Sequence, residues 1–223
     1  ISIAIKLRRK FIQLFYASGA SSLAPHILLE ESGLDYVTEK VNLDVKTWSK
    51  GNYNVINPKS YVPSLRIENG TVLTECAVIL EYIASQVPNK QLMGQYDSAI
   101  YWEQRIWLNY IATELHKNFI SPFRKGNWLP NTVESKKLVY DRVLPRLKYV
   151  DEALKGRDYL VDHHFSAPDA YLFVMTNWLT RLEYGFDQLD NLKKFDKNMR
   201  KRDSVQAVLK QEGRPHSLQD QAK

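Results

Sequence analysis

The first part of the chain alternates short apolar runs with amphipathic segments. Runs rich in aromatic and β-branched residues favour strands, whereas apolar residues spaced by three and four favour helices. Asn69-Gly70 lies between two strand-like runs and is a strong hairpin signal, while Gly33 is typical of a helix end. In chain order the pattern predicts a strand at 11–16, a helix at 22–32, a strand at 36–43, an irregular helix around 48–53, strands at 63–67 and 71–73, and a helix at 74–87.

The pattern changes after a polar linker at 88–95. Beyond it we find no convincing strand, and the apolar positions keep helical spacing. The Ser-Ala-Pro-Asp segment at 166–169 has a capping-box pattern directly before a very apolar stretch, which predicts the start of a buried helix. Pro145 falls inside a helical pattern, where proline can introduce a kink. Helices are predicted at 98–119, at 133–154, after 166 and at 195–209.

The order of the first seven elements is that of a thioredoxin-like unit, a βαβ unit followed by ββα. We therefore expect an α/β thioredoxin-like domain over residues 11–88. An all-α, helical-bundle domain is expected to follow over residues 96–212. Both spans are long enough to form a small domain with its own core.

Composition and charge exclude some classes of protein. Hydrophobic residues make up 44% and charged residues 25% of the 223 residues, as in ordinary globular proteins. No apolar run approaches the roughly 18 residues that cross a bilayer, so no membrane partner is expected. The first ten residues are apolar and then basic, the reverse of a secretory signal. The basic stretch 193–202 is typical of a solvated helix face, and no nucleic-acid partner is expected.

The chain has a single cysteine, Cys76. It can form neither an internal disulfide nor a Cys-x-x-Cys redox pair, so we expect a reducing, cytoplasmic location. His163 and His164 are adjacent, which directs them to different sides, and no third ligand is obvious nearby. The sequence therefore predicts no metal site.

Five segments together resemble one known family. They are LFYASGASSLAPHILLEESGLDY at 14–36, INPKSYVPSL at 56–65, LTECAVILEYIA at 73–84, WLNYIATELHK at 107–117 and FSAPDAYLF at 165–173. In their order and spacing they are similar to the soluble glutathione transferases, and within these to the bacterial beta class, over roughly residues 12–210. The resemblance implies an enzyme that activates the thiol of glutathione for attack on a hydrophobic electrophile. It also implies a role in detoxification, glutathione as a co-substrate with no cofactor, and a homodimer.

The resemblance implies two backbone sites for glutathione. The Val62-Pro63 bond is expected to be cis, which is uncommon, so that the Val62 backbone can pair with the cysteine of glutathione. Glu75 and Cys76 open a helix whose free N–H groups favour an anion, and they are expected to hold the γ-glutamyl end. Without the family context, Glu75 would be only a favourable first-turn acid.

Four further residues match family positions around the same site. Lys46 is expected to reach the glycine carboxylate, although a lone lysine is more often simply solvated. Asn109, His116 and Lys117 are expected to face the site from the helical domain. Positions 109, 113 and 116 share one face of a regular helix, so Asn109 and His116 could reach one cleft. His116 is equally suited to pack between the domains.

The group that meets the glutathione thiol is where the chain departs from the beta class. That class has a cysteine at the position of Ser21, and serine cannot form a mixed disulfide. A hydroxyl can instead donate a hydrogen bond to a thiolate. Ser21 is the first candidate, Ser22 is the second and is also suited to cap the helix, and Tyr16 is the third. His116 is a further catalytic candidate.

Two other functions remain open at this stage. Loss of the family cysteine is compatible with a non-catalytic module that binds glutathione or a protein. A thiol oxidoreductase is disfavoured because Cys76 lies at the wrong end of glutathione to attack the bound sulfur. An electrophile site is expected between the domains, near aromatic residues that are also suited to a core: Phe119, Phe123, Trp128 and Trp178.

Overall fold

The structure is a computed structural model that describes residues 11–119, 129–130 and 132–213. The larger sheet in this part of the chain contains β1 (Ile12–Tyr16), β2 (Tyr36–Lys40), β5 (Ser64–Arg66) and β6 (Val72–Thr74). The strands lie in the order β2-β1-β5-β6, with β1 parallel to β2 and the other neighbours antiparallel. Leu65 lies opposite Leu73, so the hairpin predicted around Asn69-Gly70 is confirmed.

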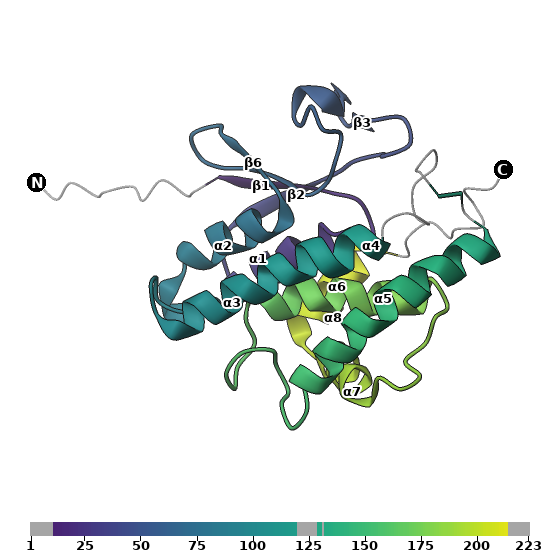
Figure 1. Cartoon of the computed structure of the whole chain (residues 1–223). Coiled ribbons are helices and arrows are strands. Elements are labelled where there is room, and N and C mark those ends of the chain that lie inside the picture. Colours follow the sequence, from purple (N-terminus) through teal and green to yellow (C-terminus); the bar gives the residue numbers. More distant parts are fainter. Residues whose placement is uncertain (1–10, 120–128, 131, 214–223) are drawn as a thin grey trace, which may run out of the picture.

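Two helices, α1 (Leu23–Ser32) and α2 (Cys76–Ser85), cover one face of this sheet (Figure 1). Helix α1 ends as predicted at Gly33, whose left-handed φ of 69° favours glycine. Because side chains alternate along a strand, Ile12 and Leu14 of β1 pack into the main core toward these helices.

The segment between β2 and β5 covers the other face and differs from the prediction. It forms a two-stranded hairpin, β3 (Thr47–Trp48) with β4 (Gly51–Asn52), followed by a single 3-10 turn, η1 (Tyr53–Val55). An irregular helix was expected here, but Gly51 adopts a φ of 112° that lets the chain turn back. Phe15, Tyr53 and Val62 form a second, smaller hydrophobic cluster on this side.

Among the described residues after the sheet, every regular element is a helix and no strand occurs. Helix α5 continues through Pro145. The elements are the 3-10 turn η2 (Pro88–Lys90), α3 (Ala99–Tyr110), a π-helical segment (Ile111–His116), α4 (Lys117–Phe119), α5 (Val133–Ala153), α6 (Ala167–Arg181), α7 (Asp190–Met199) and α8 (Asp203–Glu212).

The predicted start of α6 is confirmed. The Asp169 carboxylate accepts the N–H of Ser166 at 2.9 Å, and the Ser166 side chain faces the N–H of Asp169, which together make a capping box. The Ser166 hydroxyl also donates to this carboxylate at 2.9 Å. The other carboxylate oxygen accepts the N–H of Leu160 at 2.9 Å. Burial raises the pKa of Asp169 to about 6, while these hydrogen bonds oppose the rise. Nearly all of α6 is buried, so it forms the centre of the helical part.

The single helix predicted at 195–209 is wrong, because the structure contains two helices that meet at residues 200–202. Arg202 leaves the helical conformation, and its guanidinium donates to Glu31 of α1 at 2.7 Å and lies over the ring of Phe165. These partners lie far away in the sequence, so the local pattern of apolar residues could not reveal the break.

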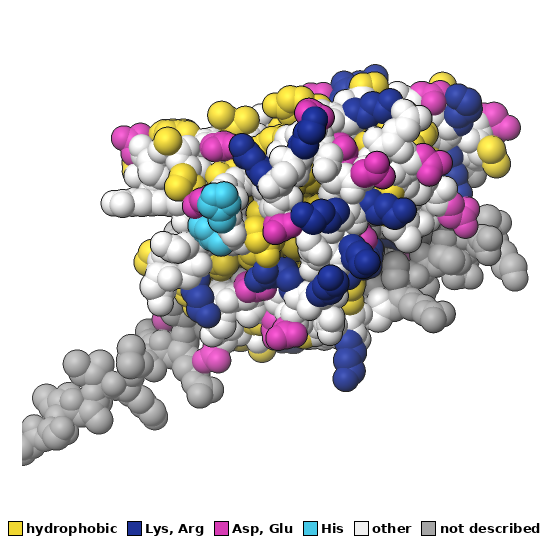
Figure 2. Space-filling view, turned by 90° about the horizontal axis from the view of Figure 1, so that it is seen from below, with side chains coloured by type: hydrophobic (Ala, Val, Ile, Leu, Met, Phe, Trp, Pro, Cys, Tyr) yellow, Lys and Arg dark blue, Asp and Glu magenta, His cyan; other side chains and the backbone are white. Residues whose placement is uncertain are grey.

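The basic stretch at 193–202 lies on the surface of α7 and the turn that follows it. The face seen from below carries Lys and Arg side chains interspersed with Asp and Glu (Figure 2). Lys194 pairs with Asp158 at 2.9 Å and Arg200 with Asp196 at 2.7 Å, which is the arrangement of a solvated helix face. Within the described ranges, no helix is both long and apolar enough to cross a membrane.

The capping box should make a large contribution to stability. Asp169→Ala would leave three buried donors without an acceptor, so we expect the free energy of unfolding to fall by about 3 kcal/mol or more. Ser98→Ala, which removes the single cap bond of α3 to the Tyr101 N–H, should cost only about 1 kcal/mol. Urea unfolding followed by circular dichroism measures both. Equal losses for the two variants would contradict this interpretation.

Candidate functional site

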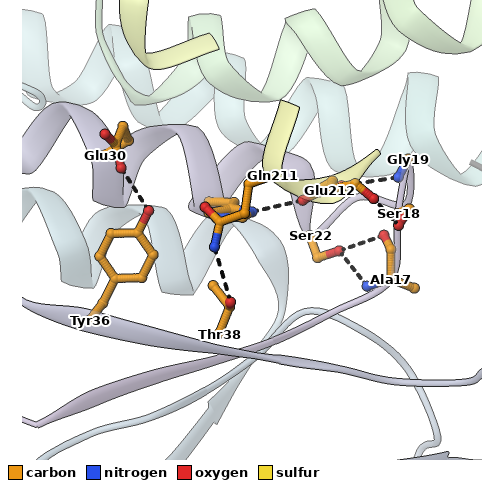
Figure 3. Close-up of polar contacts among 10 residues, drawn as sticks. Ala17, Ser18, Gly19, Ser22, Glu30, Tyr36, Thr38, Gln211 and Glu212 are labelled. Atoms are coloured by element: carbon orange, nitrogen blue, oxygen red, sulfur yellow. Dashed lines mark hydrogen bonds and ion pairs between the residues drawn. The ribbon is translucent and has the colours of Figure 1, made fainter. Parts of the chain in front are cut away.

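The loop between β1 and α1, residues 17–22, is closed by its own hydrogen bonds. The Ser22 hydroxyl accepts the N–H of Ala17 at 3.1 Å and donates to the Ala17 carbonyl at 3.2 Å (Figure 3). It makes no side-chain cap bond to α1, so the expectation that it caps this helix is wrong. The hydroxyl is buried, and both of its hydrogen bonds lie within the loop, where the Ala17 carbonyl also accepts the N–H of Ala20 at 3.0 Å.

Ser21 lies where three segments of the sheet-bearing part meet. Its side chain is 4% exposed, and its Oγ donates to the carbonyl oxygen of Val62 at 3.2 Å. The Val62-Pro63 bond is cis, as expected from the resemblance. The thiol of Cys76 donates to the main-chain carbonyl of Ser21 at 3.6 Å. Folding therefore brings Ser21, the Val62-Pro63 bond and the start of α2 together.

Glu75 precedes α2 with a positive φ of 68°, and its carboxylate is exposed. The Nζ of Lys59 lies 2.5 Å from this carboxylate and 2.8 Å from the hydroxyl of Thr74. Lys59 was not among the predicted site residues, although it falls inside the INPKSYVPSL segment at 56–65. Its place beside Glu75 depends on the register of the β5–β6 hairpin, in which Ser64 lies opposite Thr74, and the sequence predicted the hairpin but not this register.

Cys76 is the first residue of α2, yet it is buried rather than activated. Burial raises the pKa of its thiol well above the usual value, a hydrogen bond with Tyr171 acts in the opposite direction, and the charge of Glu75 adds to the rise. Because desolvation outweighs any effect of the helix N-terminus, the thiol stays protonated at neutral pH.

Tyr16 points away from Val62. It packs in the main core, on the α1 side of the sheet, with its ring centroid 5.5 Å from that of His26. Burial, with the nearby charges of Glu212 and Glu39, raises the pKa of its phenol. The alternation of β1 therefore separates Tyr16 from the hydroxyl of Ser21.

His116 packs against α6. Its Nδ1 lies 2.6 Å from the hydroxyl of Tyr171, and its ring meets the indole of Trp178 edge to face at 5.1 Å. Trp178 in turn donates its indole N–H to the carbonyl of Gly19 at 2.8 Å, two residues before Ser21. His116 is therefore connected to the Ser21 loop through one aromatic side chain.

The spacing of Asn109 and His116 differs from that in a regular helix. Asn109 lines a surface depression of about 570 Å³ on α3, and His116 is not part of its lining. The prediction assumed a regular helix, but Ile111–His116 is π-helical, with more residues per turn, and this changes the register between the two positions. The depression is lined by Trp102, Arg105, Ile106, Asn109, Tyr110, Thr113 and Glu114.

The remaining predicted residues are placed as follows. Lys117 is exposed at the start of α4, and Lys46 is half-buried beside β3 with a positive φ of 56°. Phe119 and Trp178 are buried in contact with each other, as expected for core aromatics. Phe123 and Trp128, like the basic residues at 6–10, lie outside the described residues.

The adjacent histidines show no metal-binding arrangement. His164 is half-buried, with its Nε2 3.0 Å from the carbonyl of Gln91 and its Nδ1 3.5 Å from Asp162. In the part of the chain that the structure describes, no three His, Cys, Asp or Glu side chains gather closely enough to hold a metal ion.

Comparison with family models and known proteins agrees with this geometry. A model of the glutathione S-transferase N-terminal domain matches residues 21–86, and a model of the C-terminal domain matches residues 110–203. These stretches include Ser21, Val62, Pro63 and Glu75. They leave out residues 17–20 and most of α8.

Three relatives show how far the similarity extends. The chain is 40% identical to glutathione S-transferase GstA of Escherichia coli O157:H7, over 91% of this chain and 99% of the relative. The solved structure of a sphingomonad glutathione S-transferase complexed with glutathione has a TM-score of 0.84 and 34% identity, covering 90% of this chain and 98% of that one. The bacterial beta class glutathione S-transferase of Sphingomonas chungbukensis has a TM-score of 0.84 and 33% identity, with coverages of 90% and 98%.

The similarity covers nearly the whole described chain, in both sequence and structure. It confirms the resemblance to the bacterial beta class and the combination of an α/β and an all-α part. Together with the meeting of Ser21, the cis Val62-Pro63 bond and the start of α2, it shows that this chain is an enzyme of the glutathione S-transferase family.

Proposed function

We propose that the Ser21 hydroxyl donates a hydrogen bond to the sulfur of bound glutathione and holds it as a thiolate. The observation that carries this proposal is the 3.2 Å hydrogen bond between the Ser21 hydroxyl and the carbonyl of Val62. A peptide that adds to the Val62 backbone, as in β-strand addition, would bring its own N–H to that carbonyl. The hydroxyl proton of Ser21 would then be released and could turn toward the sulfur.

The energy required is within reach of one hydroxyl. A free thiol has a pKa of about 8.5, so only about 3% of it is ionised at pH 7. Lowering the pKa by about 2 units takes about 2.7 kcal/mol. One hydrogen bond to a charged group contributes about 1.5–3 kcal/mol, and the free N–H groups at the start of α1 add to this.

The ends of glutathione would be held by charged residues on either side of Ser21. We assign the γ-glutamyl end to Glu75 and the N–H groups at the start of α2, where the N–H of Cys76 lies. The 2.5 Å pair of Lys59 with Glu75 supports this, because Lys59 provides a cation beside the site of the γ-glutamyl carboxylate. Four further contacts with glutathione remain predictions. They are Lys46, which we assign to the glycine carboxylate, and Asn109, His116 and Lys117.

The reaction would be the addition of the thiolate to a small hydrophobic electrophile. Catalysis would then come from ionising the thiol and holding the two reactants together. Glutathione would enter as a co-substrate, and we assign no cofactor. A detoxifying role and a cytoplasmic location fit this chemistry, because glutathione is a cytosolic thiol pool and the single cysteine forms no disulfide. The relatives named as transferases favour catalysis over a non-catalytic binding module.

We further propose that the protein is a homodimer joined through α2 and α3. The two helices are linked by an ion pair between Glu81 and Arg105, and they lie side by side in Figure 1. Around this pair the surface is apolar: Ile106 is 66% exposed and Trp102 is 48% exposed. Large apolar side chains gathered in this way are typical of an interface, and a two-fold axis would bury both copies of the patch.

Ser21→Ala should raise the pKa of the bound glutathione thiol by about 1–2 units, because the hydrogen bond to the thiolate is lost. The activity below that pKa should fall by a factor of about 10–100. The thiolate absorbance of the complex, titrated against pH, measures the shift. Ser22→Ala is the matched control, since that hydroxyl is used within the loop. If the thiol pKa rises in Ser22→Ala but not in Ser21→Ala, the donor to the sulfur is Ser22 and not Ser21.

Ile106→Asp should convert the dimer to a monomer, because an unpaired carboxylate would be buried at the centre of the interface. Light scattering coupled to size-exclusion chromatography gives the mass directly. Leu138→Asp is the control, since Leu138 is 60% exposed but belongs to α5 and not to α2 or α3. A wild-type chain that is already monomeric at micromolar concentration would contradict the proposal.

Cys76 should be almost inert toward thiol reagents in the folded protein. Its burial and raised pKa leave little thiolate, so we expect labelling to be slower by a factor of about 100 than in urea-unfolded protein. Because the chain has one cysteine, release of a chromogenic thiol reports on this residue alone. Rapid labelling of the folded protein would favour the alternative of a thiol oxidoreductase.

A further inference from the structure

The end of α8 reaches back to the loop that presents Ser21 (Figure 3). Glu212 is the last residue of this helix, and its side chain is 2% exposed. One carboxylate oxygen accepts the N–H of Gly19 at 3.1 Å, and the main-chain carbonyl of Glu212 accepts the hydroxyl of Ser18 at 2.7 Å. Two consecutive residues of the loop are therefore bonded to a residue almost two hundred positions later in the chain.

Gly19 is held on both sides of its backbone by the helical part. Its N–H is bonded to Glu212, and its carbonyl accepts the indole N–H of Trp178 at 2.8 Å and a guanidinium N–H of Arg181 at 3.5 Å. Its φ of 70° lies in the left-handed region that favours glycine. Neither peptide group of this residue can rotate without breaking a buried hydrogen bond, and Ser21 lies only two residues further on.

The other oxygen of the Glu212 carboxylate meets His26 of α1, with Nδ1 at 2.8 Å. Both side chains are almost fully buried, so the carboxylate has no solvent to replace a lost partner. Helix α1 begins directly after Ser21 and Ser22. The two oxygen atoms of the Glu212 carboxylate therefore hold both the loop residue Gly19, before Ser21, and helix α1, which follows Ser21.

A second carboxylate joins α1 to α8 without touching the loop. Glu31, near the end of α1, accepts from Arg202 at 2.7 Å and from the hydroxyl of Ser204 at 2.6 Å. Its contacts involve the beginning of α8, whereas those of Glu212 involve the end. Changing Glu31 therefore affects the docking of α8 on α1 alone, whereas changing Glu212 also affects the loop.

We infer that Glu212 is a positioning residue of the glutathione site, which holds the 17–22 loop so that the Ser21 hydroxyl is aimed at the sulfur. The inference rests on the proposed role of Ser21. A hydrogen bond to a thiolate depends on distance and angle, so a small displacement of the loop weakens it. Among the described residues, Glu212 is hydrogen-bonded to Ser18, Gly19 and His26, so it acts on the site through the loop and α1.

The test is Glu212→Gln, which keeps the size of the side chain but replaces one accepting oxygen with an NH2 group. Whichever way the amide turns, the best acceptor left for the N–H of Gly19 is a neutral oxygen, which binds it more weakly than a carboxylate does. We expect the pKa of the bound glutathione thiol to rise, and kcat/KM for glutathione to fall about tenfold, in line with loss of a hydrogen bond to a charged group. The KM for the electrophile should stay within about twofold of wild type, since only the thiol is misplaced.

Glu31→Gln is the matched control, because it makes the same chemical change at the other α1–α8 contact. It should lower the melting temperature but leave the thiol pKa at the wild-type value. Glu212→Asp keeps the charge and should recover part of the lost activity, and it serves as the second variant if Glu212→Gln does not fold. Equal thiol pKa values in Glu212→Gln and Glu31→Gln would overturn the inference, because docking of α8 alone would then explain every effect.

Titrating Ser21→Ala in the same way distinguishes the positioning role of Glu212 from the proposed role of Ser21. If Ser21→Ala raises the thiol pKa and neither Glu212 variant does, the positioning role is overturned while the role of Ser21 stands. If Ser21→Ala leaves the thiol pKa unchanged, the role of Ser21 fails and the positioning inference fails with it. A rise in both, with little further change in the double variant, is the result expected here.

Discussion

The buried polar groups of the loop between β1 and α1 must all find partners, and this requirement organises the site. The hydroxyl of Ser22 satisfies Ala17 within the loop, at 3.1 and 3.2 Å. The N–H and the carbonyl of Gly19 take partners from α8 and α6. Only the hydroxyl of Ser21 is directed toward the Val62 side of the sheet. The loop is rigid because leaving any of these groups unpaired would cost more than the net value of a hydrogen bond.

A serine at this position changes the chemistry that the scaffold can support. A cysteine could exchange disulfides with glutathione, whereas a hydroxyl can only donate to or accept from the sulfur. The lone thiol of the chain does not take over this role, because Cys76 is buried and donates to the Ser21 carbonyl. The role proposed for Ser21, stabilisation of a thiolate by a fixed donor, depends on position more than on reactivity.

Helix α6 links the two parts of the protein. Its start is fixed by Asp169, which pairs with Ser166 and Leu160. Further along, Tyr171 meets His116, and Trp178 reaches the carbonyl of Gly19. Since this helix is almost wholly buried, displacement at its start would be transmitted to the loop that carries Ser21.

The features that could be predicted from the sequence are local ones, whose signals lie within a few residues. The Asn69-Gly70 hairpin, the end of α1 at Gly33 and the capping box before α6 follow from turn and cap chemistry, and each is found in the structure. The five family segments likewise located Ser21 beside the cis Val62-Pro63 bond, because the resemblance carries the arrangement of the fold with it.

Features that depend on distant partners became visible only in the folded chain. Arg202 pairs with Glu31 at the break between α7 and α8, and the π-helical segment changes the register between Asn109 and His116. The contact of Glu212 with Gly19 spans 193 positions, so no local pattern could report it. Local propensity acts over one or two turns of chain, whereas a buried charge or backbone group takes whatever partner the packing of the whole molecule brings to it.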